Sequence, residues 1–211
     1  MDWGWTKKAD SQRLLSWLAM NFKYHVHTPL SRMKNLPLMH YMMSLAGIRW
    51  TMICEESDRV AIPTTNWSHL MICDKCPEGY FAGNWKSNWF LDHMEIQEGT
   101  RYLCCNDDDF YEPNFFQKLD AVAGDVLVCS MHRAQDVLFA EPGNLRGGMI
   151  GGEQLILDGS VQKDFRYGNH YAGDWDMIAA VTDKHRPVFV RDAYVLWNYL
   201  EPGRWKEVLC P

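Results

Sequence analysis

Short apolar runs alternate with longer segments of helical periodicity through the first 130 residues. The apolar runs predict five strands, at Lys23–Thr28, Ile48–Cys54, Ser68–Cys73, Arg101–Cys105 and Asp125–Ser130. Between them the pattern predicts helices from Leu36 to Leu45, from Trp85 to Met94, and from Pro113 to just before Gly124. Strands that alternate with helices are typical of a largely parallel sheet covered by helices on its faces. We therefore expect an α/β fold with a mixed, mainly parallel central sheet flanked by helices.

This alternation breaks after Ser130. Residues 131–152 are irregular and rich in glycine, and long irregular stretches inside a domain are more often functional than idle. A strand at Gln154–Leu157, a helix opening at Gly173 and two short strands, Pro187–Val190 and Ala193–Trp197, complete the pattern.

The domain boundaries follow from the same pattern. Ser11 is placed to cap a short helix, so residues 1–22 are expected to form an N-terminal helical extension. Residues 23–211 are expected to form a single domain. Within the chain, the break in the pattern separates residues 1–130 from residues 131–211.

Polar residues gather where the predicted strands end. Thr28 and Pro29 end the first strand, Glu55 ends the second, and Asn106 to Asp109 follow the fourth. Sheets of this kind bind ligands at the carboxyl ends of their strands, so a site is expected there.

Three adjacent carboxylates follow the fourth strand, and Glu112 comes shortly after them. Neighbouring carboxylates repel one another, and a bound divalent cation removes that penalty. If the strand continues, Asp107 and Asp109 lie on one face and suit an ion such as Mn²⁺ or Mg²⁺. The other interpretation is a solvated acidic turn that caps the helix at Pro113. The spacing fits neither a calcium-binding loop nor a phosphatase with an aspartyl nucleophile.

The segment YLCCNDDDFYEPNFFQKL resembles the strand, aspartate motif and following helix of GT-A glycosyltransferases, particularly those of the family 2-like group. In that family the motif reads D-x-D or D-x-D-D and is followed after three residues by proline. Aligned on Pro113, Asn106 takes the first aspartate position and Asp108 and Asp109 take the later ones. Aligned as D-x-D, the pair is Asp107 and Asp109. The resemblance implies that Asn106, Asp107 and Asp108 contact the nucleotide sugar and that Asp107 and Asp109 hold the metal.

Other segments extend the resemblance over roughly residues 23–200 in the same order. The resemblance implies that residues 1–130 form the nucleotide-binding part of the domain and residues 131–211 its acceptor and catalytic part. The segment HVHTPLSRMKNLPLMHYMMSL resembles the first strand and the loop after it, which implies that Thr28, Pro29 and Arg32 lie around the nucleotide. The segment IRWTMICEES resembles the second strand, whose terminal acid, here Glu55, contacts the base or ribose. The segment GYFAGNWKSNWFLD resembles the one that precedes the metal motif, with Lys86 suited to a phosphate or base.

The segment YAGDWDMIAAV is similar to the family's E-D-x-D-L helix start, so Asp174 takes the position of the catalytic base and Asp176 is the second choice. Such a carboxylate accepts the proton of the acceptor hydroxyl as the anomeric carbon is attacked. Asp174 at a helix start also fits a simple N-cap, and one residue can serve both roles.

Three further groups carry alternative chemistry. Cys73 and Cys76 have the spacing of half a zinc site or a redox pair, but no second pair completes a zinc site. His25 and His27 alternate on a strand, where packing is the simpler explanation than metal ligation. The glycine pairs within residues 147–152 fit a phosphate-binding nest, a mobile acceptor loop or plain turns.

Composition narrows the class of protein. The net charge is −6 and no basic run occurs, which argues against nucleic-acid binding. Seven scattered cysteines do not form a disulfide framework, and the first residues do not read as a signal peptide. No apolar run reaches the length of a membrane span, so we expect a cytoplasmic protein of bacterial or viral type. Ten tryptophans, nine tyrosines and nine phenylalanines fit both a dense core and a carbohydrate site.

Taken together, these features predict a glycosyltransferase of hexosyltransferase type that needs Mn²⁺ or Mg²⁺. It would move a sugar from a UDP-sugar to a glycan or other hydroxyl acceptor, in glycan synthesis. Two alternatives stay open: a sugar-phosphate nucleotidyltransferase, although the glycine-rich loop it needs after the first strand is missing between Thr28 and Arg32, and a non-catalytic carbohydrate-binding domain.

Overall fold

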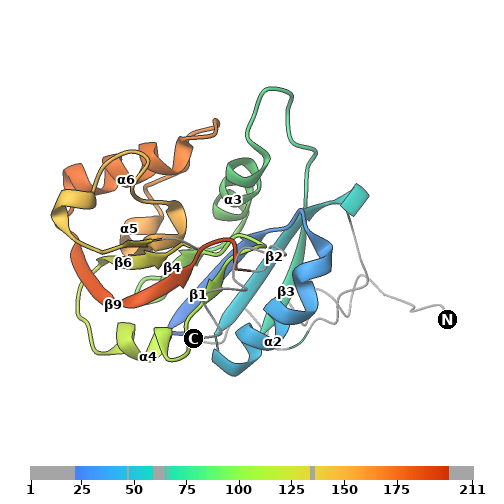
Figure 1. Cartoon of the computed structure of the whole chain (residues 1–211). Helices are drawn as coiled ribbons and strands as arrows, with labels where there is room; N and C mark the ends of the chain where they lie inside the picture. Colours follow the sequence, from blue (N-terminus) through green and yellow to red (C-terminus); the bar gives the residue numbers. More distant parts are fainter. Residues whose placement is uncertain (1–21, 47, 59–64, 66, 134–135, 200–211) are drawn as a thin grey trace.

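A computed structural model of the chain describes residues 22–46, 48–58, 65, 67–133 and 136–199 (Figure 1). These residues form an α/β fold around one curled sheet of nine strands. The helix predicted to begin at Ser11, and all but the last residue of the predicted N-terminal extension, lie outside the described residues.

The strands and helices are bounded as follows. The strands are β1 Tyr24–Pro29, β2 Arg49–Glu55, β3 Ser68–Cys73, β4 Arg101–Cys104, β5 Phe110–Tyr111, β6 Val126–His132, β7 Val137–Leu138, β8 Leu155–Asp158 and β9 Val188–Leu196. The α-helices are α2 Leu36–Ala46, α3 Ala82–His93, α4 Phe115–Asp120, α5 Gly159–Gln162 and α6 Gly173–Lys184. Short 3₁₀ helices lie at Met33–Asn35, Glu56–Asp58, Pro142–Asn144 and Gly152–Gln154.

The sheet has the strand order β3-β2-β1-β4-β8-β6-β9-β5, with β7 paired to β6. Strands β1 to β4 are parallel, β8 is antiparallel to both β4 and β6, and β9 is parallel to β6. Strands β1, β2, β3, β4, β6 and β9 therefore run in one direction, and β5, β7 and β8 run in the other. The predicted mixed, mainly parallel sheet is confirmed.

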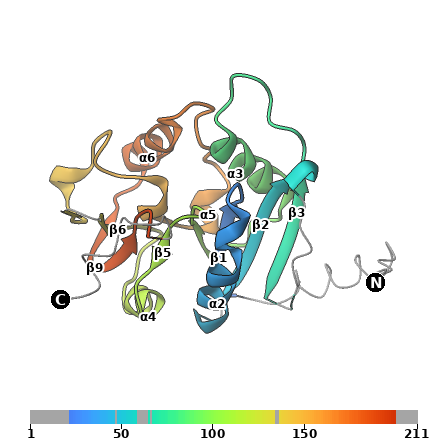
Figure 2. The same ribbon diagram turned by 45° about the vertical axis from the view of Figure 1, so that its right-hand side comes forward.

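Helices cover both faces of this sheet. Figures 1 and 2 show α3 and α6 on one face and α2 and α4 on the other. Each face has its own hydrophobic core: Met39, Met43 and Phe115 pack beneath the sheet with Val26 and Trp50, and a separate set from α3 and α6 packs above it. Successive strand residues point to opposite faces, which is why both faces of these strands are apolar.

The strand predictions at β1, β2, β3, β4, β6 and β8 agree with the structure within about two residues, and Ser68–Cys73 agrees at both ends. Two predictions near the carboxyl terminus were wrong in detail. The segments Pro187–Val190 and Ala193–Trp197 are one strand, β9, whose register with β6 shifts between Cys129 and Ser130.

The helix predicted from Pro113 begins later. Pro113 lies in a turn, and α4 starts at Phe115 after Asn114, which has a positive φ of 67°. Asparagine tolerates this left-handed conformation better than most residues, so the chain turns before the helix starts. The acidic residues 107–109 therefore do not cap α4, and that interpretation is wrong.

None of the helices in the described part of the chain is long and apolar enough to cross a membrane.

His25 and His27 are fully buried on β1, where they pack against Phe90 of α3. The His27 ring stacks on Phe90 with the ring centroids 4.8 Å apart. Burial lowers the pKa of both imidazoles, that of His27 to about 3. The packing explanation for this histidine pair is the one that the structure supports.

This burial predicts sensitivity to acid. The unfolded chain binds a proton at His27 near pH 6.5, whereas the folded chain binds one only near pH 3. The free energy of unfolding therefore decreases as the pH is lowered through this window. The loss from His27 between pH 7 and pH 5 should be about 2 kcal/mol. Urea unfolding as a function of pH measures it, and a His27→Leu variant should lose this part of the dependence.

The exposed His93 provides the matched control, since His93→Leu should keep the slope of the parent. Identical pH dependence in the parent and in His27→Leu would contradict the assignment.

Candidate functional site

The carboxyl ends of β1, β2 and β4 meet at one edge of the sheet, and the amino-terminal end of β8 lies at the same edge. Strand β8 reaches this edge because it runs antiparallel to β4. In their register Leu103 pairs with Ile156, and continuing it by three residues places Asn106 opposite Glu153. The site is built around this edge.

Asp107 is almost fully buried and is held by the loop that follows β1. Its carboxylate accepts hydrogen bonds from the backbone amides of Ser31 and Arg32 and from the Ser31 hydroxyl. The Arg32 guanidinium donates to Asp107 at 2.6 Å and approaches Asp108 to 3.3 Å. The Asn35 amide donates to the Asp107 backbone carbonyl at 2.7 Å. Asp107 thus fixes the loop after β1 through charge-assisted hydrogen bonds.

Asp109 faces different partners. One carboxylate oxygen accepts from the Asn198 backbone amide at 2.8 Å, and the other accepts from the Asn106 side-chain amide at 3.2 Å. The same Asn106 amide also donates to Glu153. Asn106 therefore bridges two buried carboxylates, one at the end of β4 and one just before β8.

Glu153 is buried, and its Oε2 atom has no hydrogen-bond partner among the described residues. Burial, followed by repulsion from Asp174, raises the pKa of Glu153 to about 7, and the charge of Asp108 acts in the same direction. Burial, Glu153 and Asp108 likewise raise the pKa of Asp109 well above its usual value. Asp174 and Asp108 therefore lie close enough to Glu153, and Glu153 and Asp108 close enough to Asp109, for their charges to oppose ionisation of these two buried groups.

Asp174 lies in the first turn of α6 and accepts from the backbone amide of Gly152 at 3.3 Å. Gly152 is closely packed, because a Cβ at this position would lie 3.1 Å from the Tyr167 ring and 3.4 Å from Asp174. The N-cap of α6 is Ala172, so the interpretation of Asp174 as the N-cap residue is wrong. The carboxylate is instead turned toward the loop that carries Glu153.

Asp107 and Asp109 do not share one strand face as expected. The chain turns after β4, with the Asp109 amide donating to the Asn106 carbonyl at 3.1 Å, so the alternation of an extended strand does not continue. The two carboxylates are held by different loops. In the positions they occupy, no three or more histidine, cysteine, aspartate or glutamate side chains of the described residues are arranged to hold a metal ion.

The predicted nucleotide contacts fall into two groups. Thr28 and Pro29 are buried, and the Thr28 hydroxyl accepts from the Trp50 indole at 2.9 Å. Arg32 is partly exposed beside Asp107, and the half-buried Glu55 accepts from the backbone amide of Cys76 at 3.2 Å.

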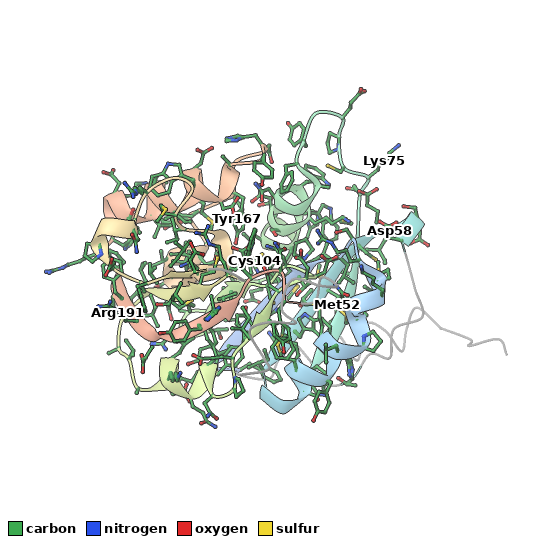
Figure 3. All side chains as sticks on the ribbon, viewed as in Figure 1. Met52, Asp58, Lys75, Cys104, Tyr167 and Arg191 are labelled. Atoms are coloured by element: carbon green, nitrogen blue, oxygen red, sulfur yellow. The ribbon has the colours of Figure 1, made fainter. Side chains whose placement is uncertain are left out.

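Lys86 is 4% exposed and ties α3 to the end of β1. Its ammonium donates to the Leu30 carbonyl at 2.6 Å and lies 3.9 Å from Asp58. In Figure 3, Asp58 lies at the margin of the molecule near β3, and Lys75 lies on the loop that rises beyond it. The ammonium thus places a positive charge at the strand edge, near the 3₁₀ helix that follows β2.

The structure does not support the alternative sites at the cysteine pair and at the second glycine pair. Burial raises the pKa of Cys73 to about 11 and also raises that of Cys76, so both are thiols in the metal-free protein. Among the described residues, no group of three or more histidine, cysteine or acidic side chains completes a metal site around them. The amide of Gly151 donates to the Gln154 side chain, and that of Gly152 donates to Asp174. These two amides are engaged within the protein and do not form a phosphate nest.

Asp176, the second choice for the base, is exposed and pairs with His170 at 2.6 Å. Its carboxylate also packs beside Gly168 in the loop before α6, whereas Asp174 is the one that accepts from Gly152. The structure therefore brings Asp174, rather than Asp176, to the carboxylate group at the sheet edge.

Glu153 is the functional candidate that the sequence analysis missed. It follows the glycine pair at 151–152 and lies at the amino-terminal end of a predicted strand. The site was expected at the carboxyl ends of the strands, so the sequence did not single this residue out. The available signal was an acidic residue placed between a glycine-rich loop and a buried strand. Tyr167 is buried beside Cys104 (Figure 3), and its ring packs against Gly152 in this loop.

Comparison of the sequence with models of known protein families finds no match, and comparison with curated proteins finds none either.

Glu153 should make the protein less stable at alkaline pH in metal-free buffer. Its pKa is about 7 in the folded chain and near 4.5 in the unfolded one, so the stability present below pH 4.5 is lost as the pH rises through 7. A Glu153→Gln variant keeps an oxygen for Asn106 without the charge. The free energy of unfolding of this variant, measured relative to that of the parent, should rise by roughly 2 to 3 kcal/mol as the pH is raised from 4 to 8.

Urea unfolding with a chelator present measures this difference, and Glu98→Gln, at an exposed acid, is the control. A parent and Glu153→Gln variant whose stabilities change in parallel with pH would show that Glu153 carries no raised pKa.

Asp107 should contribute more to the free energy of unfolding than Asp136, which pairs with Arg133 at the surface. Asp107→Ala leaves the backbone amides of Ser31 and Arg32 without their acceptor and removes the nearer acidic partner of the Arg32 guanidinium, which should cost about 2 kcal/mol. The exposed pair of Arg133 and Asp136 is the control, because surface ion pairs contribute about 0–1 kcal/mol. Thermal unfolding of Asp107→Ala and Asp136→Ala compares them, and equal losses would rule out the anchoring role.

Proposed function

We propose that this protein is a metal-dependent glycosyltransferase of GT-A fold that transfers a sugar from a UDP-sugar donor to an acceptor hydroxyl. One observation carries the proposal. Asp108, Asp109, Glu153 and Asp174 come together from three separate segments at the carboxyl edge of the parallel strands. A folded chain gains nothing in stability by gathering repelling carboxylates, so their convergence indicates a ligand that offsets the charge.

The donor diphosphate would lie between these carboxylates and the cations of the same edge. Arg32 keeps part of its guanidinium exposed while it pairs with Asp107 and Asp108, so it is placed to contact phosphate oxygens. Lys86 adds positive charge near the end of β1, and Glu55 at the end of β2 is placed to accept from the ribose or base.

The side chains present fit a hard divalent cation in their chemistry. Glu153 offers a buried carboxylate oxygen without a partner, and Asp108 and Asp109 supply further carboxylates. These groups would need to turn toward one another to share an ion. When bound, Mn²⁺ or Mg²⁺ offsets the charge of the diphosphate and makes it a better leaving group.

Asp174 is the proposed base. As the acceptor oxygen attacks the anomeric carbon, the Asp174 carboxylate takes the hydroxyl proton. The bond between the anomeric carbon and the phosphate oxygen breaks, and its electron pair leaves with UDP. Arg32 offsets the charge that develops on the departing diphosphate. This direct displacement inverts the configuration at the anomeric carbon.

Two measurements on the full chain test the proposal. UDP together with Mn²⁺ should raise the melting temperature, whereas either alone should have little effect, since a ligand stabilises the state that binds it. UDP-glucose, UDP-galactose and UDP-N-acetylglucosamine should be screened for Mn²⁺-dependent release of UDP. The absence of any metal-dependent response to UDP in either assay would refute the proposal.

The Asp174→Asn variant separates chemistry from binding. It should lower the rate of UDP release by a factor on the order of 10² to 10⁴, the usual contribution of a general base, and should keep the response to UDP and Mn²⁺. Asp183→Asn, an exposed acid later in the same helix, should have the activity of the parent. Full activity in Asp174→Asn with loss in Asp176→Asn would move the base to Asp176.

The same assays identify the alternatives. A nucleotidyltransferase would release pyrophosphate from a nucleoside triphosphate and a sugar phosphate. A carbohydrate-binding domain would bind sugars equally well with and without Mn²⁺.

A further inference from the structure

Two aromatic side chains are unusually exposed beside the site. Tyr171 is 84% exposed and Phe81 is 40% exposed, and their ring centroids lie 5.5 Å apart in an edge-to-face arrangement. Phe81 directly precedes α3, and Tyr171 lies in the turn before α6. We call this pair the aromatic platform. Large exposed aromatic surface is costly to leave in water, so it calls for an explanation.

Hydrogen bonds join the two segments that carry the platform. The Phe81 amide donates to the Asn169 carbonyl at 3.3 Å, which joins the two segments. The buried Asn84 amide donates to the carbonyls of Gly168 and His170, each at 2.9 Å. A Cβ at Gly173 would overlap the Gly168 carbonyl, so the close approach of these segments requires glycine.

The platform also lies beside the proposed base. Tyr171 precedes Asp174 by three residues, and the amide of Gly173 donates to the His170 carbonyl at 2.9 Å, which leads the chain from the platform directly into α6. Figures 1 and 2 show the start of α3 and α6 on the same side of the sheet. The segment that carries Tyr171 thus continues without interruption into the turn of α6 that carries Asp174.

The chemistry of this surface selects among ligands. A sugar ring has a face of C–H groups that packs on an aromatic ring and an edge of hydroxyl groups that needs hydrogen-bond partners. His170 and Asp176, paired at 2.6 Å and both more than half exposed, supply such partners next to Tyr171. The neighbouring carboxylates of Asp174 and Asp176 would repel an anionic ligand.

We propose that Phe81 and Tyr171 form the acceptor subsite and that the acceptor is a neutral saccharide stacked on them. This inference rests on the proposed function, of which it specifies the acceptor class.

The test uses the full chain with UDP and Mn²⁺ on an array of immobilised neutral mono- and oligosaccharides. The parent should bind a subset of these sugars. Tyr171→Ala and Phe81→Ala should each weaken this binding about tenfold, as expected for the loss of one aromatic contact. Tyr171→Phe keeps the ring and should keep most of the binding. Tyr41→Ala, which removes another exposed tyrosine on α2, should have no effect.

A second readout separates the acceptor subsite from the donor site. Transfer of the sugar to water needs no saccharide acceptor, so UDP release in its absence and the thermal response to UDP with Mn²⁺ should be unchanged in Tyr171→Ala and Phe81→Ala. Transfer to the bound saccharide should fall at least tenfold.

Three results would overturn the inference: no saccharide binding by the parent, equal binding by the parent and both alanine variants, or loss of the UDP response in those variants, which would place the nucleotide on the platform. Self-association that depends on Tyr171 without sugar binding would assign the platform to a protein contact instead. The parent could bind sugars through Phe81 and Tyr171 and yet show no metal-dependent response to UDP. That result would support the saccharide site on the platform and would refute the glycosyltransferase proposal.

Discussion

Carboxylates that leave water must find donors or a counter-charge, and the edge of the sheet in this protein is organised by that requirement. Asp107 meets it completely, with two backbone amides, a hydroxyl and a guanidinium around one carboxylate. Asp109 and Glu153 meet it only in part, because they share one amide from Asn106. This difference separates Asp107, an anchor that stabilises the fold, from Asp109 and Glu153, which remain available for a ligand.

The anchor explains how the site keeps its shape. The loop after β1 carries Arg32, and it is held at its amides by Asp107 and at the Leu30 carbonyl by Lys86. Two charged side chains from β4 and α3 thus fix the segment that would contact a nucleotide. The second half of the chain contributes through Gly152, whose lack of a side chain lets Tyr167 and Asp174 approach the loop that carries Glu153. The site depends on these backbone contacts as much as on its charged groups.

The aromatic excess of the composition is divided in a similar way. Trp50 and Phe115 fill the core beneath the sheet, while His27 and Phe90 stack above it. Phe81 and Tyr171 remain at the surface, held there by asparagine side chains of α3 and not by aromatic packing in the core.

The sequence by itself determined the strands and helices of the first half of the fold. Strands buried on both faces read as short apolar runs, as at Ser68–Cys73, and the aspartates after β4 followed from position alone. Local patterns failed where the backbone departs from regular geometry: β9 was divided because its bulge brings Arg191 and Asp192 into the strand, and the turn at Asn106 separated Asp107 from Asp109.

Only the tertiary structure decided which carboxylates share the site. Glu153 reaches it because β8 runs antiparallel to β4, and strand direction depends on long-range pairing that residue periodicity does not encode. The roles of Asp107 and Thr28 were likewise set by partners far along the chain, the loop after β1 for one and Trp50 for the other. Hydrophobic periodicity determines the elements, whereas the register between distant strands determines the chemistry at their ends.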